Sequence, residues 1–343
     1  MASPNPLRKR SESSCHSLAT WIVDRFGGDD AKQAVSDYVE ELVSKCGAIS
    51  PPVRLAKVAE RIGVNPNPIY KPNVTEGALK IVDGCIRIVL RNNSKTPPPP
   101  NSPRFRRMRF TYAHELGHTL FYDLDARPQT RVAPEGNYRF EEQLCNRAAS
   151  RFLIPNFMLQ KELAGVYELS PELLCALSNE FQTSVQTMAY RIAESVPDNL
   201  EADQIYILST NAAGIRGLGV EKPRCLACLV PKQLSAQGLS FLHSFQGIDR
   251  IKQNSKTADS PWSLEEYFHK SLNRRIGEEL ATHETLRCPD GHVVQLSAVH
   301  KTIGDGPLVW TTGRIRILKP ASSPKPLGSG TGNPLYYCHQ NRK

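Results

Sequence analysis

Two histidines four residues apart, His114 and His118, with Glu115 between them, are the residues of this sequence best suited to chemistry. On a helix, side chains at this spacing project from one face about one turn apart, so both imidazoles can reach a single cation. Neutral imidazole suits Zn²⁺, and Glu115, on the neighbouring edge of that face, can accept a proton from a water activated by the metal. The pattern therefore predicts a zinc-dependent hydrolase with Glu115 as its catalytic base.

Chance does not account well for this motif. A chain of this composition contains His-Glu-x-x-His at random with a frequency of about 2%. The alternative interpretation is a helix with two surface histidines and an incidental glutamate. However, the flanking residues predict a helix that lines the core, where uncompensated histidines and a carboxylate would be unfavourable. These flanking residues are Phe110, Ala113, Leu120 and Phe121.

A third ligand must come from another element, because a catalytic zinc normally takes three protein ligands and keeps a fourth position open. The helix predicted over residues 139–153 offers Glu142 and Asn146, four residues apart on one face. Glu142 would supply a carboxylate ligand, and the Asn146 amide could hydrogen-bond the far nitrogen of a ligating histidine. Glu141 is an equal rival as ligand, and a solvent-facing Glu142 is the alternative. The residues alone leave this choice open.

Two segments, RFTYAHELGHTLFYD and EEQLCNRAASRFLIP, resemble the motifs of the ImmA/IrrE family of zinc metallopeptidases. The family pattern is R-F-T-x-A-H-E-x-G-H followed by E-x-x-A-N-x-F-A-x-x-L-L-x-P, and the similarity extends over residues 30–195. The alignment of Cys145-Asn146 with Ala-Asn implies that Glu142 is the third ligand. On this alignment, Glu141→Gln should leave metal affinity unchanged.

This sequence departs from the family pattern in three places, none of which is a proposed ligand. Cys145 replaces a small Ala, Ala148 stands where Phe or Tyr is usual, and a proline-rich insertion containing residues 97–100 precedes the zinc helix. We expect Cys145 to be a small buried core residue rather than a redox or inhibitory group.

Hydrophobic periodicity around these motifs predicts an α+β fold: a helix-rich zincin-like peptidase core with a small sheet, a short helical segment, and a β-rich C-terminal domain. Asp83-Gly84 is a two-residue hairpin signal, and the four prolines predict a surface loop over residues 93–107. Predicted helices span residues 29–46, 53–62, 109–122, 139–153, 170–181, 183–196 and 263–280; predicted strands span residues 77–82, 85–92, 204–210, 224–230, 293–299 and 308–318.

The domain organisation expected from these patterns has five parts. They are a flexible tail at 1–28, a zinc metallopeptidase core at 29–165, a helical segment resembling a helix-turn-helix at 166–200, a β-rich and possibly sensory domain at 201–320, and a disordered tail at 321–343. In the fourth part, Cys225, Cys228, Cys288 and His292 offer ligands for a second, structural metal site. Buried or solvent-exposed thiols are the favoured interpretation, because a regular strand would separate Cys225 from Cys228.

Composition places the chain among cytoplasmic globular proteins. The net charge of +9 is diluted over 343 residues, and the 9 cysteines are scattered, which indicates a reducing compartment rather than a disulfide framework. The sequence shows no apolar run of transmembrane length and no secretory signal, so we expect no membrane interaction. Residues 170–195 lack the basic face of a DNA-reading element, and direct nucleic-acid binding is not expected.

The favoured function is a zinc-dependent endopeptidase that cleaves a protein substrate. The strand at residues 86–90 is expected to be an exposed edge that holds the substrate extended, while Tyr112, Tyr138 and the C-terminal histidines are unranked donors to the oxyanion. The resemblance implies that the substrate is a helix-turn-helix repressor in a stress or mobile-element response, with the C-terminal domain as sensor. The alternative is a metal-bound regulator that acts by binding protein or DNA, but such a protein has no need of Glu115.

Overall fold

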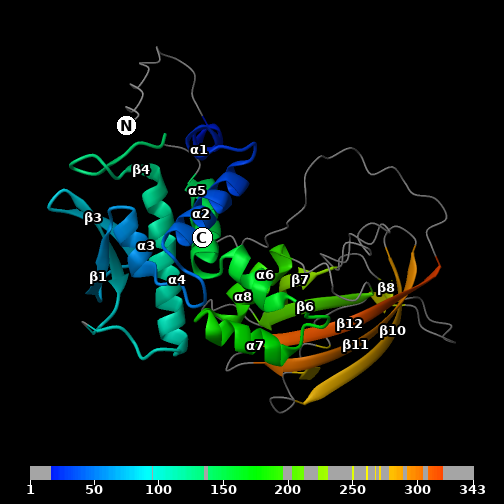
Figure 1. Cartoon of the computed structure of the whole chain (residues 1–343). Helices are drawn as coiled ribbons and strands as arrows, with labels where there is room; N and C mark the ends of the chain where they lie inside the picture. The colour runs from blue at the N-terminus through cyan, green and yellow to red at the C-terminus, as the bar shows by residue number, and fades with distance from the viewer. Residues whose placement is uncertain are drawn as a thin grey trace. The chain divides into compact units, whose positions relative to one another are not determined.

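The computed structural model describes residues 17–94, 96–134, 138–195, 203–211, 223–230, 249–250, 260–261, 267, 270–271, 278–288, 292–303 and 308–319. The contacts divide the chain into two units, residues 1–155 and 156–343. Helices and a small sheet form the first unit, and the described residues of the second form further helices and a larger sheet (Figure 1). This arrangement confirms the predicted α+β class with a β-rich C-terminal region.

Polar caps begin several helices of the N-terminal unit. Ser17, Asp30 and Ser102 each accept a hydrogen bond from the backbone N–H three residues later. The helices are α1 (Leu18–Phe26), α2 (Ala31–Lys45), α3 (Leu55–Arg61), α4 (Pro103–His118) and α5 (Tyr138–Leu153), and the 3₁₀ turn η1 (Thr119–Phe121) extends α4. Helix α4 lies between α5 and the small sheet (Figure 1). Within that sheet, α4 contacts the second and third strands in chain order, β2 and β3.

The small sheet has the order β1-β3-β2, with β1 (Asn65–Lys71) parallel and β2 (Gly77–Val82) antiparallel to β3 (Cys85–Arg91). Asp83 and Gly84 have φ of 52° and 74°, which is the turn geometry that the hairpin signal requires. Strand β1 was not predicted, because it contains Pro66 and Pro68. A strand tolerates such prolines at the edge of a sheet, which is where β1 lies.

The prediction that residues 86–90 form an exposed edge is wrong. Strand β3 is the central strand, and Ile86, Ile88, Val89 and Leu90 are all buried. Hydrogen bonds to β1 and β2 occupy both sides of β3, so the edges belong to β1 and β2.

Two further differences surround the zinc helix. Helix α4 begins at Pro103 instead of residue 109, because the Ser102 side chain caps it and Pro103 fits the first helical turn. The predicted loop at residues 93–107 is correspondingly shorter. After η1, the chain forms a second short hairpin, β4 (Tyr122–Asp123) and β5 (Thr130–Arg131), for which no strand was predicted from the sequence.

The C-terminal unit begins with α6 (Asn156–Leu163), α7 (Pro171–Glu180) and α8 (Val185–Glu194), and α8 contacts the first edge strand of the sheet. Among the described residues the sheet has the order β7-β6-β12-β11-β10-β8-β9. Its strands are β6 (Gln204–Asn211), β7 (Pro223–Leu229), β8 (Asp249–Arg250), β9 (Ser260–Pro261), β10 (Glu279–Arg287), β11 (Val293–Ile303) and β12 (Leu308–Lys319). One face carries an apolar cluster that includes Ile205, Ile207, Leu286, Val294, Leu296 and Ile315.

Several predictions fall at the limits of the described chain. The helix expected over residues 263–280 lies largely outside the described residues, and its last two residues begin β10. Residues 1–16 and 320–343 also lie outside them, whereas residues 18–26 of the expected tail form α1 with Ile22 buried. No described helix is long and apolar enough to cross a bilayer.

Candidate metal centre

Small residues allow α4 and α5 to cross at close range. A Cβ placed on Gly117 would lie 3.0 Å from Cα and 3.1 Å from the carbonyl oxygen of Cys145, and 3.3 Å from Cβ of Ala148. These separations are shorter than ordinary van der Waals contact, so the crossing depends on glycine at position 117. Ala148 lies at the same crossing, and its small side chain contributes to the close approach.

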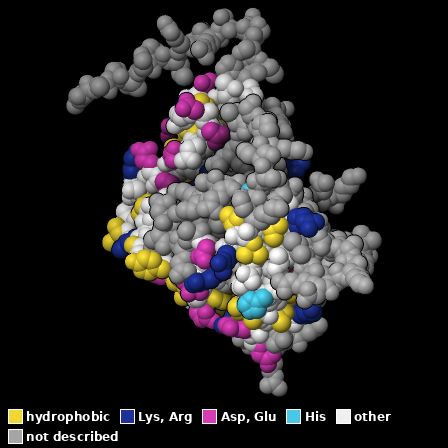
Figure 2. Space-filling view, turned by 90° about the vertical axis from the view of Figure 1, so that its right-hand side faces the viewer, with side chains coloured by type: hydrophobic (Ala, Val, Ile, Leu, Met, Phe, Trp, Pro, Cys, Tyr) yellow, Lys and Arg dark blue, Asp and Glu magenta, His cyan; other side chains and the backbone are white. Residues whose placement is uncertain are grey.

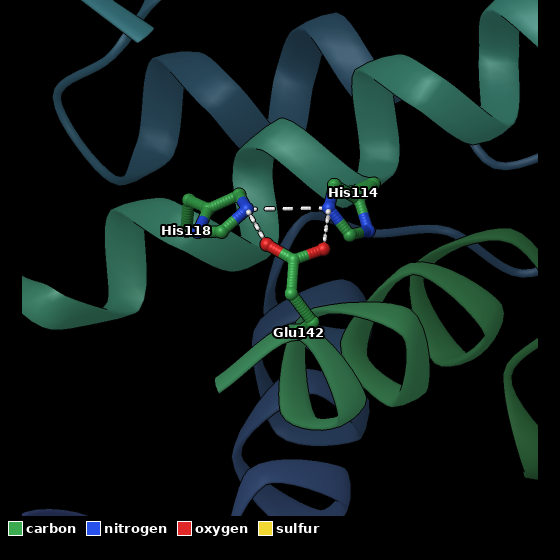
Figure 3. Close-up of side chains that lie close together, drawn as sticks. All are labelled: His114, His118 and Glu142. Atoms are coloured by element: carbon green, nitrogen blue, oxygen red, sulfur yellow. Dashed lines mark hydrogen bonds and ion pairs between the residues drawn. The ribbon is translucent and has the colours of Figure 1, made fainter. Parts of the chain in front are cut away.

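The close crossing brings His114 and His118 of α4 against Glu142 of α5. Figure 3 shows the two imidazoles and the carboxylate turned toward one another. The two Nε2 atoms are 3.2 Å apart, Nε2 of His118 is 3.2 Å from Oε1 of Glu142, and Nε2 of His114 is 3.4 Å from Oε2 of Glu142. The three residues thus present a convergent set of two nitrogens and a carboxylate.

This geometry fits a zinc ion. With zinc–ligand distances near 2.0–2.1 Å, the ligand atoms of a tetrahedral site are separated by about 3.3 Å, which agrees with all three observed separations. Two imidazole nitrogens that face each other this closely also require a proton or a cation between them. The pKa of Glu142 is held well below its usual range, chiefly by hydrogen bonding to His114 and then to His118, so the carboxylate is ionised and available as a ligand.

The far nitrogens of both histidines also have partners. Nδ1 of His114 lies 3.0 Å from Oδ1 of Asn146, as the four-residue spacing on α5 suggested. Nδ1 of His118 lies 3.4 Å from Oε1 of Glu141, whose two oxygens accept hydrogen bonds of 3.0 and 2.7 Å from Arg131. Glu141 therefore faces the outer side of His118 rather than the convergent ligand atoms.

This placement revises the expectation that Glu141→Gln leaves metal affinity unchanged, because Glu141 contacts a ligand. Sequence reasoning missed Arg131 altogether. It lies in β5, and no local pattern indicates that this short hairpin brings its guanidinium to α5.

Glu115 is buried beside the metal centre, with 7% of its surface exposed. Burial raises its pKa, while His118 and His114 act in the opposite direction. The first residue of β2 lies directly against it, since a Cβ on Gly77 would be 2.5 Å from Oε1 of Glu115 and 2.7 Å from Cγ2 of Thr111. The absence of a side chain at Gly77 gives Glu115 the room that it occupies.

The remaining candidates in this unit differ in availability. Tyr112 is buried and donates a hydrogen bond of 3.0 Å to the carbonyl of Pro66, and burial raises its pKa. Tyr138 is 72% exposed, and the Glu142 carboxylate raises its pKa, so its hydroxyl lies near the centre and is accessible. Cys145 is fully buried, and burial raises its pKa well above the usual thiol range, so it is not a reactive thiolate.

The second metal site suggested by the cysteines is not assembled by the sheet. Among the described residues, only His114, His118 and Glu142 bring three metal-ligating side chains within reach of one another, so Cys228, Cys288 and His292 do not form such a group. The backbone N–H of Cys288, which directly follows β10, bonds to the carbonyl of His292 at 2.8 Å. The side chain of Cys225 lies outside the described part of the chain.

A known protein family is similar to the part of the chain that forms the metal centre. Residues 101–193, which contain α4, α5 and all three convergent residues, match the model of the IrrE N-terminal-like domain. Among solved structures, a Mycobacterium tuberculosis transcriptional regulator is 14% identical with a TM-score of 0.43, covering 87% of this chain and 80% of that chain, too low a similarity to support a functional inference. Comparison with curated proteins gives no match. Residues 101–193 are therefore similar to an IrrE N-terminal-like domain, and this match supports the resemblance to the ImmA/IrrE family that the sequence motifs indicated.

Proposed function

We propose that this protein is a zinc-dependent endopeptidase that hydrolyses a peptide bond in a protein substrate. The convergence of His114, His118 and Glu142 at the spacing of a tetrahedral zinc site, with Glu115 buried beside it, is the observation that carries this proposal. When bound there, zinc would supply a Lewis acid that polarises the scissile carbonyl and lowers the pKa of the attacking water.

Glu115 acts as the general base and then as the general acid. Its carboxylate takes a proton from the attacking water and delivers that proton to the leaving amine. Burial raises its pKa and so favours the proton-accepting role, and the contact with the backbone of Gly77 limits the positions that the side chain can adopt. Tyr138 is the more suitable of the two tyrosines to stabilise the oxyanion, because it is exposed, whereas the buried Tyr112 hydroxyl already donates a hydrogen bond to the carbonyl oxygen of Pro66.

The substrate adds as an extended segment to the edge of β2. This strand pairs with β3 on one side, and its first residue, Gly77, lies against Glu115. Among the described residues no strand pairs with the other side of β2, so a peptide that pairs there near Gly77 would pass beside the catalytic base, with main-chain hydrogen bonds providing affinity. Ile81, which is 51% exposed at the far end of β2, offers an apolar contact for a substrate side chain.

The substrate is a protein, and a helix-turn-helix repressor, as the family resemblance suggests, is the first to test. Direct DNA binding is disfavoured, because Arg191 is the only Lys or Arg in α7 and α8, and it is fully buried and bonded to Glu194. Among the described side chains that are coloured in Figure 2, basic and acidic groups are interspersed. The C-terminal sheet would then serve as a sensory domain.

The Glu115→Gln variant tests this proposal. It preserves side-chain size but cannot accept a proton, and Glu115 is not one of the three ligands, so the variant should bind zinc as the wild type does. Cleavage of repressors encoded beside the gene should fall by about 10²–10⁴-fold, and the variant should retain its uncleaved substrate on co-purification. Wild-type protein with and without chelator is the control. Full activity of Glu115→Gln in cells would show that the protein acts by binding alone.

A further inference from the structure

We infer that the ion pair between Arg131 and Glu141 positions His118 for metal binding, an inference that rests on the proposed zinc site but not on catalysis. Within the N-terminal unit, Arg131 of β5 and Glu141 of α5 form a two-pronged contact, with Nη1 bonding to Oε1 at 3.0 Å and Nη2 bonding to Oε2 at 2.7 Å. Bidentate pairs of this kind fix the orientation of the carboxylate as well as its position.

The orientation of Glu141 determines what His118 can offer to the metal. The nearer Glu141 oxygen lies 3.4 Å from Nδ1 of His118. A carboxylate at this place favours a proton on Nδ1, which leaves the lone pair on Nε2, the nitrogen that faces Glu142. Asn146 plays the equivalent part for His114, with its carbonyl oxygen 3.0 Å from Nδ1. Both imidazoles therefore direct Nε2 toward the same point, each through a different partner.

The guanidinium of Arg131 is itself held by packing. It lies 5.4 Å from the ring centroid of Phe121, a fully buried residue whose ring is 6.4 Å from that of His118. Arg131 of β5 pairs with Tyr122 of β4. Tyr122 directly follows Phe121 in the chain, so the strand pairing keeps Arg131 close to Phe121. Arg131, Phe121 and His118 thus form one packed group.

The chain just before Arg131 is anchored by a buried glutamine. The Gln129 side chain accepts a hydrogen bond of 2.6 Å from the N–H of Ile86 and donates to the carbonyls of Gly63 at 3.0 Å and Leu124 at 2.7 Å. Its backbone N–H bonds to the carbonyl of Gly84 at 3.0 Å. These bonds connect the segment to β3 and to the turn before it, so Arg131 extends from a segment that is fixed by hydrogen bonds.

Zinc affinity, measured by competition with a chromophoric chelator, tests this inference without a protease assay. Glu141→Gln and Arg131→Gln should each weaken zinc binding by about 10–100-fold, the range for loss of a group that orients a metal ligand, while one zinc per chain still binds at saturation. The double variant should lose no more zinc affinity than whichever single variant binds zinc more weakly, because the two residues act as one unit. Arg131→Lys keeps the charge without the two-pronged geometry and should give a smaller loss.

Glu40→Gln is the matched control, because Glu40 forms a 3.3 Å pair with Arg151 of α5 away from the metal centre. Its zinc affinity should equal that of the wild type. Circular dichroism of the zinc-free variants reports whether they fold. Affinity of folded Glu141→Gln within twofold of wild type, or a loss no larger than that of Glu40→Gln, would overturn the inference. An inactive protein with the expected affinity changes would instead contradict only the proposed function.

Discussion

The Gly117→Ala variant separates the packing role of this glycine from its effect on the helix. A glycine inside a helix costs about 1 kcal/mol relative to alanine, so the substitution would stabilise α4 if position 117 faced open space. Instead the new Cβ would lie 3.0 and 3.1 Å from backbone atoms of Cys145, which cannot move unless α5 moves. Overpacking of this kind costs about 1–3 kcal/mol, so we expect the packing effect to outweigh the helix-propensity gain and the net effect to be a destabilisation of about 1 kcal/mol.

The same displacement should weaken metal binding. Glu142 lies on α5, and His114 and His118 lie on α4, so a separation of the helices by a few tenths of an ångström lengthens distances that now match a tetrahedral site. Urea unfolding in the presence of chelator measures the stability of the zinc-free protein, and chelator competition measures zinc affinity. A Gly117→Ala variant that is about 1 kcal/mol more stable than wild type, with unchanged zinc affinity, would refute the reasoning.

The remaining predictions concern other parts of the structure. Gly77→Ala would place a Cβ 2.5 Å from Oε1 of Glu115, so cleavage should fall while chelator competition shows unchanged zinc affinity; equal loss of both would contradict this. Burial lowers the pKa of His300 from 6.5 to about 4, so the unfolded state binds the proton first. Protonation of His300 therefore does not affect the free energy of unfolding above pH 6.5, and it lowers that free energy by about 3 kcal/mol as the pH falls from 6.5 to 4. In urea unfolding, the wild type should lose about 3 kcal/mol more stability than His300→Gln between pH 6.5 and 4, and parallel curves for the two proteins would count against this. Cys145 should resist alkylation by iodoacetamide in the folded protein and react after denaturation, as mass spectrometry can follow.

The local parts of the structure could be predicted from sequence because they depend on local periodicity. The four-residue spacing of His114 and His118 places them on one helix face regardless of the rest of the fold, and Asp83-Gly84 specifies its turn by backbone conformation alone. The start of α4 was misplaced because the basic residues after Pro103 lack apolar periodicity, although Ser102 supplies a cap.

The parts that depend on tertiary neighbours could not be predicted in the same way. The order of strands in the small sheet is not encoded in any single strand, so β3 was mistaken for an edge although Val89 is buried on the face opposite Ile86, Ile88 and Leu90. The rotation of α5 about its axis, which directs Glu142 to the histidines and Glu141 to Arg131, follows from packing against α4. The family resemblance, rather than residue spacing, favoured Glu142 over Glu141.

X-ray absorption at the zinc edge tests the central claim most directly, because it reports the atoms that bind the metal. For protein loaded with one equivalent of zinc, the account predicts two histidine nitrogens and at least one oxygen at about 2.0–2.1 Å, and loss of one histidine shell in His118→Ala. A sulfur shell at about 2.3 Å would place the metal on cysteine thiolates instead. A spectrum that His118→Ala leaves unchanged would likewise contradict a metal centre made of His114, His118 and Glu142.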